Sequence, residues 1–441
     1  MKTKIARQLL ATIAAAAIVG CGGGDSGGGR GDSGASGGPP RLPPPFISGL
    51  SYSPTAVQAN SGGGQVTVHG SISFSNAGDG GASVTIAVLD QGGATVATNT
   101  TPIANGSTSA TAAAQVNVNT AVAGNYTIRV TLRDLAGRDS NTLTGSFRVA
   151  TALWFPEPAM PTPRQSFAVA ASGTRIYVIG GELAGMGTPG RESALVEVFD
   201  TVTETWRASG PPMPTARKSA AAAAVGDAIY VIGGASLAAP GGLTTVEAFY
   251  PAAAVWLPLS PMPTPRSGAA VAVLNDQICV FGGKSGGIEV ATTECYNPDW
   301  DMWFDPMPSM PTARYSLGAG VIGEAVYAVG GAAAASATGY VGTAERFNVN
   351  ETWGTVAPMP TLRENAGVAA VGGLLYVIGG DNALAAALDT VEAFDPVQGA
   401  WTGKTPVPVP LASVGAVSIG TAIYVFAPFN SFGYVPADDP L

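Results

Sequence analysis

The chain has 441 residues, of which 46% are hydrophobic and only 12% are charged, and it contains 60 glycines and 34 prolines. This composition supports hydrophobic cores and is typical of many strands joined by turns, so it argues against a helical protein. The net charge of −9, with no basic run beyond the first few residues, excludes nucleic acid as an expected partner.

Residues 1–20 have the pattern of an export signal. Three basic residues precede an apolar stretch at 9–19 that is too short to span the core of a bilayer. The sequence Ile-Val-Gly-Cys at 18–21 resembles the lipobox of bacterial lipoproteins, which implies cleavage before Cys21 and lipidation of this cysteine. An ordinary signal peptide is the alternative. We expect an exported protein that is attached to the outer membrane by its lipid alone and faces the periplasm or the cell surface.

The next two segments are a predicted tether and a predicted β domain. Residues 21–45 are mostly glycine, serine and proline and should form a flexible linker. Residues 46–150 contain about seven short strand-like segments, which predicts a sandwich that acts as a spacer. The stretch 123–137, which contains Tyr126, resembles the late strands of an immunoglobulin-like domain and implies a corner tyrosine. His69, the only histidine, is expected to be a surface or satisfied residue rather than a ligand.

A repeat of about 50 residues fills the chain from 151 onward. Each copy has, in fixed order, a Met-Pro-Thr-x-Arg element, an apolar run closed by Gly-Gly, a Glu-x-Phe/Tyr strand and a tryptophan. The tryptophans are Trp154, Trp206, Trp256, Trp303, Trp353 and Trp401. Proline turns the chain into a new strand, and Gly-Gly permits positive φ and close backbone approach. Such four-stranded units cannot bury both faces alone, so the copies must pack together.

This pattern resembles the kelch repeat, and the resemblance implies a β-propeller over residues 151–441. Five copies are complete, whereas the sixth lacks a tryptophan and has Ala427 and Pro428 in place of Gly-Gly. We expect the strand around Trp154 to complete the sixth blade, so that no sheet edge stays open. The predicted fold class is therefore all-β, a six-bladed kelch propeller preceded by an immunoglobulin-like sandwich.

The residue types in the propeller exclude several chemistries. Histidine is absent from 151–441. Kelch propellers include copper-radical oxidases, whose site needs two histidines, so this enzyme class is excluded together with His-based triads and ordinary zinc hydrolysis. No metal or cofactor is expected. Cys279 and Cys295 fall on neighbouring antiparallel strands, which leaves a disulfide or two buried thiols as the alternatives.

The arginines of the repeat are candidate ligand-binding residues, because in kelch propellers this position begins the innermost strand near the mouth of the central channel. They are Arg164, Arg217, Arg266, Arg314 and Arg363. Residues that follow Gly-Gly, among them Glu182, Lys284 and Asp381, are expected on the same face. The alternative is a set of internal Arg–Glu pairs, because each copy also carries one glutamate, at 197, 247, 294, 345 and 392.

The loops after Gly-Gly vary most and are the expected recognition loops. Their larger side chains are Met186, Arg191, Lys284 and Tyr340, and Trp300 is the one tryptophan outside the repeat register. We expect a non-catalytic cell-envelope lipoprotein whose propeller binds or adheres to a protein or glycan, an anionic one if the arginines line the mouth. The alternative is a His-independent carbohydrate enzyme such as a sugar epimerase or mutarotase, which a convergent acid/base pair at the channel mouth would favour. A purely structural role is the third hypothesis.

Overall fold

The computed structural model describes residues 44–53, 56–58, 64–75, 81–103, 110–150, 153–183, 191–208, 210–304, 307–348, 350 and 352–436. These residues form strands and turns without an α-helix, as the all-β prediction requires. A search of the same residues for an apolar helix that could span a membrane finds none. The predicted signal peptide, Cys21 and the linker up to residue 43 lie outside the described ranges.

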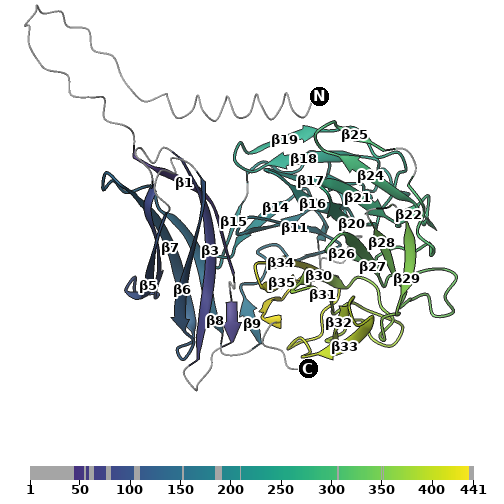
Figure 1. Cartoon of the computed structure of the whole chain (residues 1–441). Helices are drawn as coiled ribbons and strands as arrows, with labels where there is room; N and C mark the ends of the chain where they lie inside the picture. Colours follow the sequence, from purple (N-terminus) through teal and green to yellow (C-terminus); the bar gives the residue numbers. More distant parts are fainter. Residues whose placement is uncertain are drawn as a thin grey trace, which may run out of the picture. The chain divides into compact units, whose positions relative to one another are not determined.

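The described residues divide into two compact units (Figure 1). The first takes its residues from 1–54, 62–120 and 124–147, and the second takes them from 55–61, 121–123 and 148–441. The second unit therefore begins its continuous part at Arg148, close to the boundary predicted at 151.

Strands β1 to β8 form two sheets. The three-stranded sheet has the order β1 (Phe46–Ser53), β3 (Gln65–Ser75) and β6 (Ala110–Asn119). The five-stranded sheet has the order β2 (Ala56–Gln58), β8 (Leu143–Ala150), β7 (Gly124–Asp134), β4 (Gly81–Leu89) and β5 (Thr95–Pro102). Ile72 and Ala114 of the first sheet line one apolar space together with Ile86 and Val130 of the second, so the core lies between the sheets. Tyr126 is buried there, with its ring centroid 6.3 Å from that of Phe147.

The second unit contains six four-stranded antiparallel sheets, which we number one to six in chain order. Sheet one is β11 (Ala168–Ser172), β12 (Arg175–Ile179), β14 (Val196–Asp200) and β15 (Thr205–Ala208), and sheet two is β16 (Ala221–Val225), β17 (Ala228–Ile232), β18 (Val246–Tyr250) and β19 (Val255–Pro258). Sheet three is β20 (Ala270–Leu274), β21 (Gln277–Phe281), β24 (Thr293–Asn297) and β25 (Met302–Trp303), and sheet four is β26 (Gly318–Ile322), β27 (Ala325–Val329), β28 (Ala344–Asn348) and β29 (Trp353–Val356). Sheet five is β30 (Gly367–Val371), β31 (Leu374–Ile378), β32 (Val391–Asp395) and β33 (Ala400–Lys404), and sheet six is β34 (Gly415–Ile419), β35 (Ala422–Phe426), β36 (Ser431–Tyr434) and β9 (Trp154–Glu157).

The six sheets follow one another in a closed ring. The first strand of each sheet contacts the first strand of the next, and β34 of sheet six contacts β11 of sheet one. The strand around Trp154 is the outer strand of sheet six, where Trp154 pairs with Tyr434. Because β9 precedes sheet one in the chain, this pairing joins the first and last repeats and leaves the ring without a gap.

Two short antiparallel strand pairs lie beside sheets one and three. In one, β10 (Arg164–Gln165) pairs with β13 (Glu182–Leu183), and in the other β22 (Lys284–Ser285) pairs with β23 (Ile288–Glu289). Both pairs lie at the end of the sheets where the Gly-Gly pairs occur, which we call the loop end. The loops that vary between the repeats are therefore gathered at one end of the ring.

Glycine is required at both positions of the Gly-Gly pair. Gly180 has a φ of +63°, and a Cβ there would lie 2.6 Å from the carbonyl oxygen of Arg217 in the next sheet. Gly181 has a φ of +100°, and its N–H donates to the same carbonyl at 2.9 Å. An alanine at Gly180 would therefore disturb the backbone junction between two sheets.

Each sheet has one residue, shortly before its first strand, that belongs to what we call the neck ring. The six residues are Ser166, Ser219, Gly268, Ser316, Asn365 and Ser413, and all six have positive φ. The N–H of Ser219 donates to the carbonyl of Ser166 at 2.8 Å, and equivalent links continue around the ring until the N–H of Val414 donates to the carbonyl of Asn365. A side chain makes the last link, because the N–H of Ser166 donates to Oγ of Ser413 at 2.8 Å.

Candidate functional site

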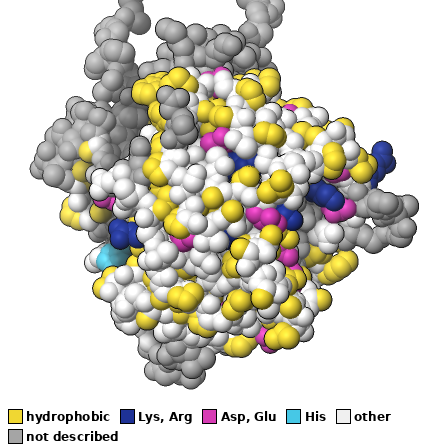
Figure 2. All heavy atoms as spheres, turned by 90° about the vertical axis from the view of Figure 1, so that its right-hand side faces the viewer, with side chains coloured by type: hydrophobic (Ala, Val, Ile, Leu, Met, Phe, Trp, Pro, Cys, Tyr) yellow, Lys and Arg dark blue, Asp and Glu magenta, His cyan; other side chains and the backbone are white. Residues whose placement is uncertain are grey.

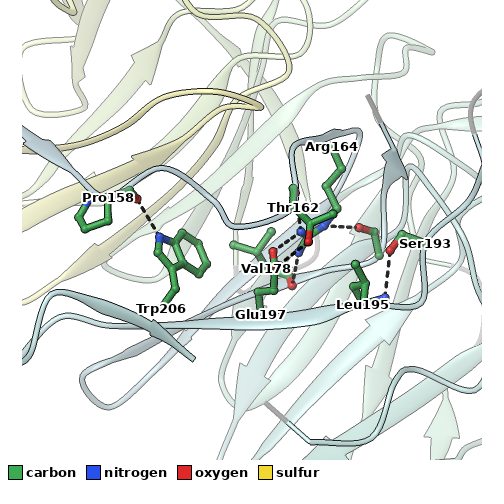
Figure 3. Close-up of polar contacts among 9 residues, drawn as sticks. Pro158, Thr162, Arg164, Val178, Ser193, Leu195, Glu197 and Trp206 are labelled. Carbon is green, nitrogen blue, oxygen red and sulfur yellow. Dashed lines mark hydrogen bonds and ion pairs between the residues drawn. The ribbon is translucent and has the colours of Figure 1, made fainter. Parts of the chain in front are cut away.

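The repeat arginines are fully buried. Figure 3 shows the polar contacts of one of them, Arg164. Its guanidinium donates to the carbonyl oxygens of Gly180, Thr162 and Val178 and forms an ion pair with Glu197. The hydroxyl of Thr162 donates to the other oxygen of the same carboxylate at 2.8 Å. The threonine, arginine and glutamate marks of the repeat therefore form one internal network inside the sheet.

The other four arginines also form a buried ion pair with the glutamate of their copy, with side chains that are 0% exposed, but their Nε has no hydrogen-bond partner. The pairs are Arg217–Glu247 at 3.0 Å, Arg266–Glu294 at 2.5 Å, Arg314–Glu345 at 2.5 Å and Arg363–Glu392 at 2.6 Å. Burial lowers the pKa of Arg363 to about 10, with Glu392 opposing that shift, so this arginine stays charged near neutral pH. The five arginines therefore form the internal Arg–Glu pairs that were the alternative to a ligand-binding role. None of these guanidiniums is exposed to meet a ligand at the loop end.

The three other predicted site residues lie at the loop end. Glu182 is half-buried and forms an ion pair with Lys218, with 2.9 Å between Oε2 of Glu182 and Nζ of Lys218. Lys284 stands on β22 with its Nζ 3.6 Å from a carboxylate oxygen of Glu289 and 3.6 Å from the ring centroid of Tyr315. Asp381 accepts a hydrogen bond from the side-chain amide of Asn365 at 2.9 Å. The structure thus separates these residues from the buried arginines with which the sequence analysis grouped them.

Five of the loop-end residues belong to a cluster from sheets three, four and five, which we call the mouth cluster. Its members are Lys284, Tyr315, Tyr340, Glu364 and Asp381. Glu364 and Asp381 are backbone partners, each donating its N–H to the carbonyl of the other at 3.0 Å. Tyr315 exchanges backbone hydrogen bonds with Ala332, and Ala332 forms a second bridge to Tyr340. Backbone pairing therefore fixes the two carboxylates and the two tyrosines at this end of the ring.

The two carboxylates of the mouth cluster are electrostatically unfavourable where they stand. Burial and the neighbouring charge of Asp381 raise the pKa of Glu364, with Lys284 and Ser316 opposing the rise. Burial also raises the pKa of Asp381, against the hydrogen bond from Asn365. Oε2 of Glu364 is buried and has no hydrogen-bond partner. Each such group favours either a proton or a cation at this position.

Two cavities lie on the axis of the ring. One of about 130 Å³ is lined by the neck ring and the residues that follow it. The other, of about 360 Å³, is lined by the first strands of all six sheets, with alanine, valine, glycine and one serine as its only lining residues. Charged side chains do not line either cavity. A site that needs ionisable groups is therefore not found along the axis of the ring.

The loops that follow the second strands of the sheets expose large apolar side chains. Those with the greatest exposed fractions are Leu384 at 96%, Leu237 at 73%, Ile288 at 69% and Phe429 at 66%. Each follows the second strand of a different sheet, namely sheets five, two, three and six. Single exposed apolar residues are common on protein surfaces, so what makes these four candidates for a contact surface is their shared position at the loop end. On the face drawn in Figure 2, charged side chains are few, and basic and acidic atoms lie beside each other between larger hydrophobic and uncharged areas.

Glu364 and Tyr315 were missed by the sequence analysis, although a signal for them exists. The residue directly after the repeat arginine varies from copy to copy, as Gln165, Lys218, Ser267, Tyr315 and Glu364. A variable polar residue at a fixed repeat position indicates a surface site. Of the other loop residues, Arg191 is exposed and Met186 lies outside the described ranges.

Two further predictions concern residues away from the mouth cluster. Cys279 and Cys295 are paired across β21 and β24 and form a disulfide, which was one of the two alternatives. Trp300 is 60% exposed in the turn before β25. His69 is exposed on β3. Among the described residues, no three His, Cys, Asp or Glu side chains are close enough together to hold a metal ion.

The comparisons with known proteins agree on one type of repeat. The model of the KLHDC2/KLHL20/DRC7 kelch-repeats domain matches residues 113–331 and 260–428. Kelch-like protein 25 of Xenopus tropicalis is 30% identical over 271 residues, which cover 60% of this chain and 44% of that protein. Kelch-like protein 34 of Homo sapiens is 30% identical over 225 residues, covering 47% of this chain and 33% of that protein. The chain thus spans less than half the length of these curated relatives.

One solved structure supports the fold alone. The chain superposes on the structure of YjhT with a TM-score of 0.51 and 14% sequence identity. The match covers 63% of this chain and 95% of that one. At this identity the likeness concerns the arrangement of the sheets and not the residues of the loop end.

Proposed function

The chain belongs to the kelch-repeat family and its second unit is an all-β kelch propeller, and from that premise we propose that the propeller is a protein-interaction module. The observation that carries the proposal is the exposure of large apolar residues on the loops of four sheets at one end of a rigid ring. Rigid scaffolds with variable loops commonly carry recognition sites. The hydrogen-bonded neck ring and the buried Arg–Glu pairs hold the bases of these loops in place.

We also propose the finer architecture and location that the sequence predicts. Six four-stranded sheets and the pairing of β9 with β36 support a propeller of six blades. Two packed sheets with a buried Tyr126 support an immunoglobulin-like spacer before it. The lipobox-like sequence at Cys21 supports a lipid-anchored cell-envelope protein that takes part in adhesion. In this proposal the linker and the spacer connect the lipid to the propeller.

The interaction proposal is tested by comparing two exposed positions at opposite ends of sheet five. Leu384 is 96% exposed at the loop end, and Val397 is 95% exposed in the turn at the other end. The full chain and its Leu237→Ser/Leu384→Ser and Val397→Ser variants are immobilised and incubated with an envelope fraction. A captured protein is then purified and titrated against all three by calorimetry. We expect binding by the wild type and by Val397→Ser and a loss of about tenfold or more in the loop variant. Equal binding by all three proteins, or no partner at all, contradicts the proposal.

A second function is favoured by the Glu364–Asp381 pair. Two adjacent carboxyl groups with raised pKa values, next to Tyr315 and Tyr340, form an acid/base pair of the kind that distinguishes the carbohydrate-enzyme hypothesis. The test is anomeric exchange of reducing sugars, followed by NMR with and without the protein. Acceleration by the wild type that Glu364→Gln abolishes supports an epimerase or mutarotase. Unchanged exchange for a panel of neutral, amino and acidic sugars argues against this second function.

A further inference from the structure

The mouth cluster carries more negative than positive charge. Lys284 is its only cation, and that ammonium already lies 3.6 Å from Glu289 and over the ring of Tyr315. Glu289 and Glu364 interact with this lysine, and Asp381 adds a third carboxylate beside Glu364. One lysine therefore cannot compensate all three carboxylates. The partner that best fits this place supplies positive charge.

The carboxylate oxygens also leave hydrogen-bonding capacity unused. Oε2 of Glu364 is buried and accepts no hydrogen bond. Leaving such an acceptor unsatisfied costs free energy, which a donor from a ligand would recover once the partly exposed side chain of Glu364 turns to meet it. Because Glu364 and Asp381 are held side by side by two backbone hydrogen bonds, their carboxylates can serve as a pair of acceptors. A guanidinium, which presents several N–H donors in one plane, matches such a pair better than a single ammonium does.

Apolar residues flank the mouth cluster on two sides. Ile288 is 69% exposed on β23, the strand that pairs with Lys284. Leu384 is 96% exposed three residues after Asp381 in the loop of sheet five. Tyr315 and Tyr340, both partly exposed, add aromatic surface to the cluster itself. A partner that inserts a basic side chain here would therefore place its neighbouring residues against apolar atoms.

We propose that the mouth cluster is a docking site for a protein segment in which an arginine is flanked by apolar residues, with Glu364 and Asp381 binding its guanidinium and Ile288 and Leu384 contacting its neighbours. This inference rests on the proposed interaction function and specifies the chemistry of the partner. It departs from the anionic ligand that the arginine ring predicted, because those arginines are buried in ion pairs. The acidic character of the whole chain, with its net charge of −9, is in keeping with a basic partner segment.

The test uses peptides that differ at one position. Four peptides of sequence Gly-Leu-X-Leu-Gly, blocked at both ends, carry arginine, lysine, glutamine or glutamate at X. Each is titrated into the full chain by calorimetry at low salt and at 0.5 M salt. We expect the arginine peptide to bind about tenfold or more tighter than the glutamine peptide, and the lysine peptide to fall between them. High salt should reduce this difference.

Two variants assign the preference to the mouth cluster. The Glu364→Gln/Asp381→Asn variant should lose the preference for arginine over glutamine. The control, Asp276→Asn, removes an exposed carboxylate from the turn between β20 and β21, at the opposite end of sheet three, and should keep the preference. If the double variant does not fold, the single Asp381→Asn variant and the peptide series on the wild type still decide the question.

Each other result overturns the inference. Equal affinity for the four peptides, tighter binding of the glutamate peptide, or no binding of any peptide at millimolar concentration rules out an arginine-binding site. Persistence of the preference in the double variant places the site elsewhere. The interaction function itself is tested separately, by the comparison of the Leu237→Ser/Leu384→Ser and Val397→Ser variants. That comparison assumes nothing about charge, so it can succeed where the peptide experiment fails.

Discussion

The indole Nε1 of Trp206 donates a hydrogen bond of 2.8 Å to the carbonyl oxygen of Pro158, which lies just beyond the last strand of the preceding sheet (Figure 3). All six repeat tryptophans make this link. The acceptors for Trp154, Trp256, Trp303, Trp353 and Trp401 are Thr405, Pro211, Ser260, Pro308 and Ala357, at 2.7–3.1 Å. The tryptophan of the repeat therefore joins each sheet to its neighbour, which explains its fixed place in the pattern.

Replacement of one such tryptophan should weaken the ring. Trp401→Phe keeps an aromatic ring beside Phe394 but removes the hydrogen bond to Ala357. We expect the free energy of unfolding to fall by about 1 kcal/mol. The control is Trp300→Phe, because Trp300 is 60% exposed and lies outside the repeat register, and its effect should stay within about 0.5 kcal/mol. Urea unfolding of both variants measures the difference, and equal effects would contradict the role of the indole N–H.

Removal of one partner of a buried ion pair should be more damaging than removal of both. Arg314 and Glu345 are both 0% exposed, so Arg314→Met leaves a buried carboxylate without its partner. We expect a loss of about 3–5 kcal/mol in unfolding free energy for Arg314→Met and a smaller loss for Arg314→Met/Glu345→Leu. A double-variant cycle measured in urea checks this order. A double variant that is less stable than the single one would show that Glu345 stabilises the sheet by contacts other than the ion pair.

The neck ring should depend on the hydroxyl of Ser413. Ser413→Ala removes the only side-chain acceptor among the described links of that ring and leaves the N–H of Ser166 unpaired, so we expect a loss of about 1–2 kcal/mol. Ser219→Ala keeps its link, because the backbone makes it, and its unfolding free energy should change little. Both residues have a φ of +53°, so backbone strain is equal in the two variants. Calorimetry of the thermal unfolding of both variants measures how much the hydrogen bond from Ser166 to Ser413 contributes to the free energy of unfolding.

Glu157 should make stability depend on pH. Burial raises its pKa to about 8, aided by the negative charge of Glu204 and opposed by Arg148. The unfolded carboxyl titrates near its ordinary value of 4.5, so the folded state holds a proton that the unfolded state releases between the two values. Stability from this group is therefore complete below pH 4.5 and is lost as pH rises to 8. We expect Glu157→Gln to be about as stable as the wild type at pH 4.5 and more stable by a few kcal/mol at pH 8.5. A constant difference at both pH values would contradict the raised pKa.

The sequence predicted the repeat architecture well because the marks of the repeat carry backbone information. The strand around Trp154 was placed in the last sheet by its repeat position, and it pairs there with β36. The alternative roles of Arg314 could not be separated, because repeat register places Glu345 on the same sheet but says nothing about how far the guanidinium lies from solvent. In the structure that side chain is 0% exposed.

Lys284, Tyr340 and Asp381 of the mouth cluster were named from the sequence, but their grouping with Tyr315 and Glu364 was not, for a different reason. Lys284 and Tyr315 belong to different sheets, and their contact depends on how sheet three packs against sheet four. The pairing of Glu364 with Asp381 forms within one sheet, but it needs the positive φ of Gly379 and Gly380 to bring Asp381 back beside Glu364. Patterns along the chain do not report such contacts between loops.

The position of β9 has a consequence for the order of events during synthesis. This strand leaves the ribosome before any of sheet one, whereas its partner β36 is among the last described residues to be made. Its unpaired edge therefore exists for almost the whole time that the chain is growing, and the other five sheets can form before it is covered. Any delay between the start and the end of translation lengthens the period in which that edge can pair with a second chain.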